Sequence, residues 1–422
     1  MEITCQRLKH ILELTGPAIP KGKKRPLPIL DNLLCKERYA VASNGEIAIA
    51  VELPELPEGE ALLVPYASLK KSLQHVPGGA LLSVSPTDAA RWLVGDRTIN
   101  ITGAGLNLSL PAGDVQDFPD FPEFEEQMAI DVDGDRFVKE TLALMPYAAT
   151  EDSRPVLTGV CLFLSSFLEE PVVGVAADGF RLAWSHLGFV TEATEGQNRE
   201  VIVPATTIKA LAQIWKQVVK RPRPNNPVNL PRLTDTPQLS INSLAVAKRY
   251  IRLAMAEGRI KFGCGEAMLL SQRIQGEYPK YMSLIPAKGA HSVVFDAGSA
   301  ERAVRQLAPV AAENNIIRLS WREGSVTFEA HNDEGGRAET SLVAVTQGEA
   351  SRIAFNLRYL SQYLNGKEGR VLLETSGQSN PGRLTHAGTP NLVLMPMFVQ
   401  WGDQPEAKPE EPVEEAESAE HE

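Results

Sequence analysis

Cysteine is scarce in this chain of 422 residues, and its thiols show no paired spacing. Cys5, Cys35, Cys161 and Cys264 are far apart and form no C-x-x-C motif, so we interpret them as structural thiols in a reducing compartment. The first residues, MEITCQRLKH, lack the apolar segment of a secretory leader. No stretch is apolar for long enough to span a membrane. These absences predict a cytoplasmic protein that makes no contact with membranes.

Catalytic and metal-binding motifs are missing as well. The seven histidines fall in no metal-ligand spacing, and the chain has neither a G-x-x-x-x-G-K-[ST] phosphate loop nor a G-x-S-x-G nucleophile elbow. Asp178-Gly179 is typical of a turn rather than of a catalytic acid, and Asn44-Gly45 occupies the matching place earlier in the chain. We therefore expect no enzyme activity, no metal and no cofactor.

Basic residues are fewer than acidic residues in the chain as a whole. The chain has 42 lysines and arginines against 53 acidic residues, a net charge of -11. The last stretch, residues 402–422, contains nine acidic residues and one lysine, so the first 401 residues carry only -3. We expect this acidic tail to be disordered. The near-neutral body leaves room for a local basic patch, and nucleic-acid binding is not excluded.

Internal repeats organise the rest of the chain. Matching segments recur at intervals of roughly 130–150 residues, too long for a solenoid. The matches are PILDNLLC with PVLTGVCL, VASNGEIAIAV with VAADGFRLAWS, QDFPDF with GEYPKY, and LLVPYASLKKSLQHV with VIVPATTIKALAQIW and IAFNLRYLSQYLNG. We predict three similar domains, residues 1–127, 128–288 and 289–401, followed by the tail 402–422. A proline-rich island at about 220–238 reads as a loop inserted in the second domain.

Each repeat has the pattern of an α+β domain, with helices packed on antiparallel sheets. Apolar residues at helical spacing mark one helix per repeat: Tyr66, Leu69, Leu73 and Val76; Ile208, Leu211, Trp215 and Val218; Leu357, Leu360 and Leu364. Alternating stretches predict strands at Leu81–Pro86, Arg318–His331 and Arg370–Ser376, with a hairpin turn at Glu323-Gly324.

The exposed faces of these helices favour basic over acidic residues. Lys209, Gln213, Lys216 and Lys220 share one face in the second repeat. Other basic positions are Lys70, Lys71, Arg302, Arg305 and Arg358, and the loop Lys21–Pro26 adds Lys23, Lys24 and Arg25. Any one helix is adequately explained as solvated surface. Their recurrence, with few carboxylates on the same faces, favours a surface that contacts phosphates without reading bases.

The repeat segments, together with ATEDSRPVLTGV, QGEYPKYMSLIP and LMPM, resemble the bacterial DNA sliding clamp, the beta subunit of DNA polymerase III. The resemblance runs from about Leu27 to Met397. It implies three tandem copies of the DNA-clamp fold and a head-to-tail homodimeric ring, with helices inside and antiparallel sheets outside. Such a ring encircles double-stranded DNA, and weak, salt-screened phosphate contacts let it slide.

The resemblance also implies a groove for short apolar peptides between the second and third domains. Partners would be the replicative DNA polymerase subunit, the clamp loader, and other polymerases and repair proteins. Matching positions are Arg154, Leu157, Thr158, Ala177, Asp178, Gly179, Phe180, Leu182, Pro286, Asn356, Tyr359, Val393, Met395, Pro396 and Met397. Flexible methionines suit a surface that accepts many peptides. Without the resemblance, Met395 and Met397 would read as core fillers.

Members of the family that the chain resembles usually end one or two residues after M-P-M, commonly with an arginine there, whereas this chain continues with Phe398, Val399, Gln400 and Trp401. We predict a last strand from Asn391 to about Leu394. We expect the four added residues either to extend the peptide groove or to lie in it and compete with partners. Two other functions stay open at this point: a clamp-fold peptide-binding scaffold or regulator that does not encircle DNA, and an enzyme whose site is assembled across domains.

Overall fold

The computed structural model describes residues 1–22, 27–86, 98–122, 124–151, 153–164, 172–188, 199–220, 250–388 and 390–401. Within this part the protein has an α+β fold and divides into two compact units. Unit 1 comprises Met1–Ile285 and Thr385–Val393, and unit 2 comprises Pro286–Leu384 and the described residues from Leu394 on. The proline-rich island after Lys220 and the acidic tail lie outside the described residues.

An eight-stranded antiparallel sheet holds the first two repeats of unit 1 together. Its strands, in spatial order, are β5 (Ala61–Pro65), β2 (Asn32–Lys36), β3 (Tyr39–Ser43), β4 (Ile47–Glu52), β16 (Ala267–Gln272), β15 (Arg259–Cys264), β14 (Tyr250–Ala256) and β9 (Met128–Asp133). The first four belong to the first repeat and the last four to the second. Ile49 pairs with Leu269 where the two halves meet, and both are fully buried. The joint is therefore part of the hydrophobic core.

Two further sheets complete unit 1. One has the order β1 (Glu2–Thr4), β6 (Leu81–Pro86), β7 (Thr98–Gly103) and β8 (Leu106–Pro111), so within the described residues β8 is an edge strand. The other has the order β13 (Arg199–Pro204), β10 (Gly159–Leu164), β11 (Val172–Ala177), β12 (Arg181–His186) and β24 (Asn391–Leu394). The predicted strands at Leu81–Pro86 and Asn391–Leu394 are confirmed with these bounds.

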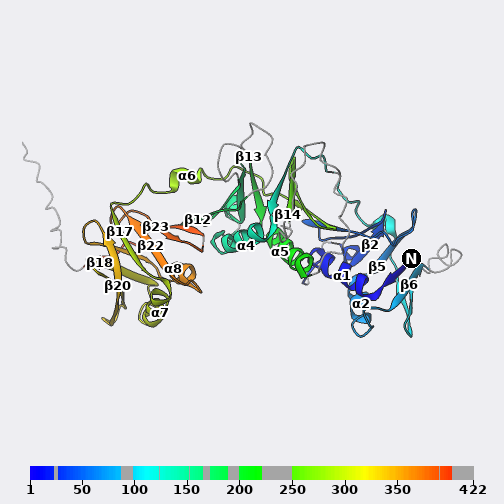
Figure 1. The fold of residues 1–422 in the computed structure, drawn as a ribbon, viewed down its shortest axis with the longest axis horizontal. Coiled ribbons are helices and arrows are strands. Elements are labelled where there is room, and N and C mark those ends of the chain that lie inside the picture. The colour runs from blue at the N-terminus through cyan, green and yellow to red at the C-terminus, as the bar shows by residue number, and fades with distance from the viewer. Residues whose placement is uncertain are drawn as a thin grey trace, which may run out of the picture. The chain divides into compact units, whose positions relative to one another are not determined.

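Helices cover the sheets of unit 1 and pack on one another in a row (Figure 1). They are α1 (Cys5–Thr15), α2 (Tyr66–Ser72), α4 (Gly134–Leu144) and α5 (Ala205–Lys220), and a short α6 (Tyr281–Leu284) comes after β16 in the chain. Thr4 and Asp133 cap α1 and α4 by accepting from Arg7 N and Arg136 N. Short 3-10 turns lie at Gly16–Ala18, Pro28–Asp31, Val115–Asp117, Met145–Tyr147 and Pro155–Leu157.

Unit 2 contains the third repeat. Its strand order is β23 (Gly382–His386), β22 (Arg370–Thr375), β17 (His291–Asp296), β20 (Arg337–Gln347), β19 (Ser325–His331), β18 (Ile316–Arg322) and β21 (Ser351–Asn356). The long β20 pairs with β19 along Arg337–Val343 and with β17 along Ala344–Gln347. Helices α7 (Ala297–Leu307) and α8 (Leu357–Leu364) pack on each other and on this sheet.

The repeat predicted from the sequence is visible as one motif that occurs three times. In each copy a strand ends and a helix begins at the next residue: β5 into α2, β13 into α5, and β21 into α8. The apolar stripes are mostly buried, but Val76 and Val218 are half-buried, and α2 ends at Ser72, before two of its predicted stripe residues. Glu323-Gly324 forms the β18–β19 turn with φ +78° at Gly324. Among the described residues, no helix combines the length and apolarity that crossing a membrane requires.

Candidate nucleic-acid and peptide interfaces

Four lysines converge on one hollow in unit 1. Helix α2 supplies Lys70, α5 supplies Lys216 and Lys220, and the loop after α1 supplies Lys21. The hollow has a volume of about 520 Å³, and one carboxylate, Glu13, also lines it. Its other lining residues are Gly16, Pro17, Ile19, Tyr66, Ala67, Gln213 and Gln217. We call this set the basic hollow; four cations against one anion make it an attractive place for phosphate groups.

Tyr66 fixes the position of Lys70 in the basic hollow. The Tyr66 hydroxyl donates to the Leu12 carbonyl at 2.6 Å, which joins α2 to α1. Lys70 Nζ lies 3.4 Å from that hydroxyl and 5.5 Å from the ring centroid. A methyl group on Gly16 would lie 2.5 Å from the same hydroxyl, so this close packing requires glycine there. The lysine is thus held by the aromatic ring instead of by a carboxylate.

Helix α5 presents its polar face as expected. Lys209, Gln213, Lys216 and Lys220 are exposed, whereas Ile208, Leu211 and Trp215 are buried. Trp215 Nε1 donates to Asp135 Oδ1 at 2.8 Å, and its ring occupies the space that a side chain at Gly134 would need. This contact between α5 and α4 sets the rotation of α5 and turns the lysines outward.

The other predicted DNA contacts of unit 1 do not line the basic hollow or lie outside the described residues. Lys71 is exposed on α2 but does not line the basic hollow, and neither does Lys209. Lys23, Lys24 and Arg25 lie outside the described residues, so of the predicted basic loop only Lys21 is seen in the hollow. Sequence reasoning grouped these residues by helix. It did not detect that α1, α2 and α5 come together, because no local pattern reports that contact.

In unit 2 the predicted arginines are exposed but each already has a partner. Arg302 Nη2 donates to Ser299 Oγ at 2.9 Å, and Arg358 Nε donates to Asn315 Oδ1 at 3.1 Å. Arg305 pairs with Glu301 Oε1 at 2.6 Å. The expected scarcity of carboxylates on these faces is therefore wrong at α7, where glutamate at the i−4 position compensates Arg305.

Four of the predicted peptide-binding residues of unit 1 lie in one buried apolar cluster. Leu157, Ala177, Leu182 and Val393 come from a 3-10 turn, from β11, from β12 and from β24. The cluster also contains Trp184, Tyr278 and Tyr281, and the sequence marked the two tyrosines only as part of a repeat. Beside it, Phe180 is 64% exposed, which is high for a large apolar side chain.

Asp178 and Gly179 form the predicted turn between β11 and β12. Asp178 Oδ1 accepts from the backbone N of Phe180 and of Arg181 at 3.0 and 3.1 Å, and Gly179 has φ +94°. Asn44 and Gly45 repeat this geometry in the first repeat. The turn is structural, and it carries Phe180 outward. Arg154 lies close to this turn, because the Nη1 atom of Arg154 is 3.1 Å from where a Cβ on Gly179 would be. The Thr158 hydroxyl donates a hydrogen bond to Pro155 O.

The remaining predicted residues belong to unit 2. Asn356 caps α8 by accepting from Arg358 N at 2.9 Å, and Tyr359 lies half-buried in the first turn. Met395 is 46% exposed, and Pro286, Pro396 and Met397 are half-buried. These two methionines are thus surface residues and not core fillers. The Met397 amide donates to Ala354 O at 2.7 Å, which holds the end of the chain against β21.

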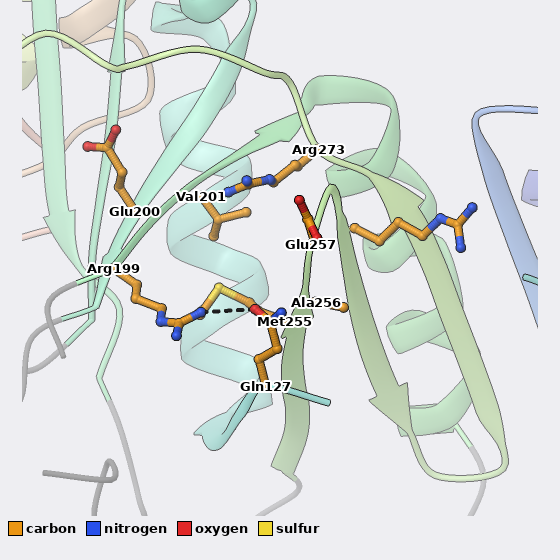
Figure 2. Close-up of a pocket in the computed structure, with 9 residues that line it drawn as sticks. Gln127, Arg199, Glu200, Val201, Met255, Ala256, Glu257 and Arg273 are labelled. Carbon is orange, nitrogen blue, oxygen red and sulfur yellow. Dashed lines mark hydrogen bonds between the residues drawn. The ribbon is translucent and has the colours of Figure 1, made fainter. Parts of the chain in front are cut away.

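A second hollow, in unit 1, was not predicted from the sequence. It has a volume of about 350 Å³ and is lined by Gln127, Arg199, Glu200, Val201, Met255, Ala256, Glu257, Arg259 and Arg273. Figure 2 shows Arg199 reaching Gln127, with a 3.2 Å hydrogen bond, while Arg273, just after β16, lies on the side of Glu257. The arginines do not meet at one point, and two glutamates share the space, so the arrangement forms no single ion site.

The described residues contain no group of three or more His, Cys, Asp or Glu side chains placed to hold a metal ion. All four cysteines are buried and unpaired. Burial raises the pKa of the Cys35 and Cys264 thiols to about 12 and raises that of Cys161 further. These thiols stay protonated and unreactive at neutral pH, which agrees with the structural role expected for them.

Comparison with known proteins identifies the repeats. Residues 135–220 match the model of the DNA polymerase III beta subunit central domain, and residues 282–397 match that of its C-terminal domain. The Caulobacter vibrioides beta sliding clamp is 25% identical over 409 residues, covering 94% of this chain and 96% of that protein. These matches indicate a bacterial DNA sliding clamp. The Pseudomonas putida beta sliding clamp is 24% identical over 412 residues, covering 94% of this chain and all of that clamp.

Solved clamp structures share the fold. The sliding clamp from Pseudomonas aeruginosa bound to griselimycin superposes with a TM-score of 0.76 at 20% identity, covering 94% of this chain and 99% of that one. The beta subunit from Streptococcus pyogenes gives 0.75 at 18% identity with the same coverage. At these identities the similarity shows a shared fold.

Proposed function

We propose that this protein is a DNA sliding clamp, in which two copies form a ring that encircles double-stranded DNA without sequence specificity and confers processivity on the replicative DNA polymerase. The observation that carries the proposal is the basic hollow, where lysines from separate helices converge in a chain that is acidic overall. In this proposal the protein binds DNA and partner proteins without catalysing a reaction, and it acts in the cytoplasm. The functional division is into three domains, 1–127, 128–288 and 289–401, with the acidic tail 402–422.

The basic hollow suits a sliding contact with DNA. Lysines are point charges on flexible chains, and they attract phosphates without fixing a base sequence. Each phosphate contact adds about 0.9 to the slope of log affinity against log salt. A few such contacts hold the duplex weakly, and the closed ring keeps the protein on the DNA. Lys23, Lys24, Arg25, Lys71, Lys209, Arg302, Arg305 and Arg358 would add dispersed charge along the path of the DNA.

Two unfilled sheet edges support a ring of two copies. Strand β8 is the edge of its sheet in unit 1, and its leucines 106, 108 and 110 alternate with polar residues. In unit 2, the Arg337–Leu342 part of β20 pairs with β19 on one side and with no other strand among the described residues. An open edge is a template for pairing with another chain. In a head-to-tail dimer, β8 of each copy would pair with β20 of the other copy. The two equivalent interfaces would close the ring.

Partner proteins would dock through short peptides with apolar side chains. In unit 1 the peptide would meet the surface over Leu157, Ala177, Leu182 and Val393, flanked by Phe180. In unit 2 it would meet Met395, Pro396 and Met397. Proposed partners are the replicative polymerase subunit, the clamp loader, and other polymerases and repair proteins that carry such peptides.

A retention assay on circular DNA tests the proposal. The clamp is loaded by its loader onto nicked circles and passed through a gel-filtration column in buffer of rising salt. We expect it to stay with the circles and to leave after they are linearised, because topology and not affinity retains it. A protein that binds peptides but is never trapped on circles would instead be a clamp-fold scaffold, and the sliding-clamp proposal would be wrong.

A further inference from the structure

The four residues Phe398–Trp401, here called the C-terminal segment, are held at both ends. At the start, the Met397 amide donates to Ala354 O on β21 at 2.7 Å. At the end, the Trp401 ring lies under two arginines, with Arg352 Cζ 4.8 Å and Arg318 Cζ 5.8 Å from the ring centroid. A chain that is fixed at Met397 and again at Trp401 has little freedom between the two points.

The two arginines are themselves well placed to hold the ring. Arg318 alternates with the buried Ile317 and Leu319 on β18, so its side chain points to the opposite face of the sheet. Arg352 lies on the neighbouring strand β21 and donates from Nε to Gln378 Oε1 at 3.0 Å. Guanidinium groups stack well on indole rings, and the Gln378 hydrogen bond that holds Arg352 beforehand reduces the entropy lost on stacking.

Between these anchors stands Phe398, which is 93% exposed. Isolated apolar residues are common on protein surfaces, but this one follows Met395, which is 46% exposed, by only three residues. Both belong to the segment that the Met397–Ala354 hydrogen bond holds against unit 2. The result is an apolar surface that continues from the methionines into Phe398, which follows the last residue matched by the C-terminal domain model.

We infer that Phe398 is a further contact residue for the partner peptide and that Trp401 positions it. The inference rests on the proposed peptide-binding function and deepens it. The occupant is a short peptide with apolar side chains, because it must meet methionine and phenylalanine on one continuous segment. An aromatic ring presented by a pre-ordered backbone loses little entropy on binding and is a common centre of binding energy.

Anisotropy titration of the full-length protein tests the role of Phe398. The probe is a short fluorescein-labelled peptide that carries leucine and phenylalanine. We expect Phe398→Ala to weaken binding about tenfold, comparable with removal of one well-packed apolar side chain from an interface. Met395→Ala should also weaken it, and Leu81→Ala, which truncates an exposed leucine on β6 in unit 1, should leave it unchanged.

Trp401 requires a readout that separates positioning from stability. Trp401→Ala should weaken the same peptide as Phe398→Ala does, with no change in melting temperature, and the double variant should be no worse than either single one. Trp401→Phe keeps a ring for the arginines and should restore most of the affinity. If Trp401→Ala melts early, Arg352→Gln removes the nearer arginine and serves the same test.

The outcomes separate the inference from the proposed function. If Phe398→Ala binds as the unchanged protein does while Met395→Ala is weakened, the C-terminal segment is not a contact. Tighter binding by Phe398→Ala would mean that the segment occludes the site, which also overturns the inference. If the unchanged protein binds no peptide of this kind, the peptide-binding function itself is wrong.

Discussion

At the scale of single residues, the basic hollow shows how positive charge is gathered in an acidic protein. Lys70 lies against Tyr66, and Lys216 and Lys220 occupy the exposed face of α5. Only Glu13 opposes them among the lining residues. Surface lysines that lack a nearby carboxylate keep their full attraction for a polyanion, since no intramolecular ion pair must be broken first.

Charge reversal at these lysines gives the first prediction. Lys70→Glu combined with Lys216→Glu should reduce the amount of clamp retained on nicked circles at moderate salt. It should also lower the salt slope by roughly one to two units, about 0.9 for each phosphate that the protein no longer neutralises. The measurement is loading over a series of salt concentrations. The proposed dimer should persist in light scattering.

Lys36→Glu provides the matched control, because Lys36 is a half-exposed lysine on β2 that does not line the basic hollow. It changes net charge in the same direction and should leave the salt slope unaltered. An equal reduction of loading in this variant would mean that overall charge, and not the hollow, governs contact with DNA.

The residue scale also marks where sequence reasoning stops. The lysines of α5 were predictable because their spacing is local. The stacking of Trp401 on Arg318 and Arg352 was not, since its members are separated by up to 83 positions in the sequence and none repeats with a period. Phe398 and Trp401 were recognised as unusual, and only the structure distinguishes the anchor from the exposed ring.

At the scale of elements, the contact between α1 and the β15–β16 turn ties the first repeat to the second. Glu266 in that turn accepts from His10 Nε2 at 2.8 Å and pairs with Arg7, which also reaches the backbone of Glu52. Burial alone would raise the pKa of the Glu266 carboxyl, but the His10 hydrogen bond and the charge of Arg7 outweigh it and hold that pKa below its ordinary value.

The lowered pKa of Glu266 predicts a pH-dependent stability. A carboxyl with a depressed pKa in the folded state stabilises the fold above its unfolded pKa and loses this effect as pH falls through the folded pKa. Glu266→Gln should therefore lower the free energy of unfolding by about 1–3 kcal/mol at neutral pH, and the difference from the unchanged protein should shrink on acidification below pH ~4.3.

Urea unfolding at a series of pH values measures this difference. Glu257→Gln is a suitable comparison, because Glu257 is exposed in the neighbouring β14–β15 turn. Its effect should be small and nearly independent of pH. A Glu266→Gln deficit that stays constant down to acidic pH would assign the role of Glu266 to shape and not to charge.

The elements themselves were largely predictable. Alternation and turn residues placed β6, the β18–β19 hairpin and β24, and the strand-to-helix repeats were read from apolar spacing. The joint between β4 and β16 was not predictable, because it pairs strands from different repeats, more than 200 positions apart. Pairing partners depend on tertiary packing, which no local pattern encodes.

At the scale of the whole molecule, the proposed ring would close through the two open strand edges, β8 and the Arg337–Leu342 part of β20. Leu108→Asp places a charge on β8 where half-buried leucine is expected to meet a second copy. We expect light scattering to give a mass near 46.0 kDa in place of twice that value, because an unpaired charge in an apolar interface costs several kcal/mol.

Leu81→Asp in the same sheet is the control for the dimer. Leu81 is exposed on β6, and its strand is paired on both sides by β1 and β7. This variant should remain dimeric and load normally. A Leu108→Asp protein that stays dimeric would place the interface elsewhere and leave β8 as an ordinary edge.

The acidic tail acts at the same scale through its charge. Removing residues 402–422 changes the net charge from -11 to -3 and leaves Phe398 and Trp401 in place. A peptide with lysines beside its apolar residues should then associate several-fold more slowly at low salt, because the tail no longer attracts it, while its dissociation rate stays the same. Stopped-flow anisotropy measures both rates, and the effect of the tail should fade as salt shortens the Debye length.

Replacing the nine acidic residues of the tail by Asn and Gln is the control and should have the same effect as the truncation. A slower dissociation in either protein would mean that the tail occupies the peptide site instead of steering peptides toward it.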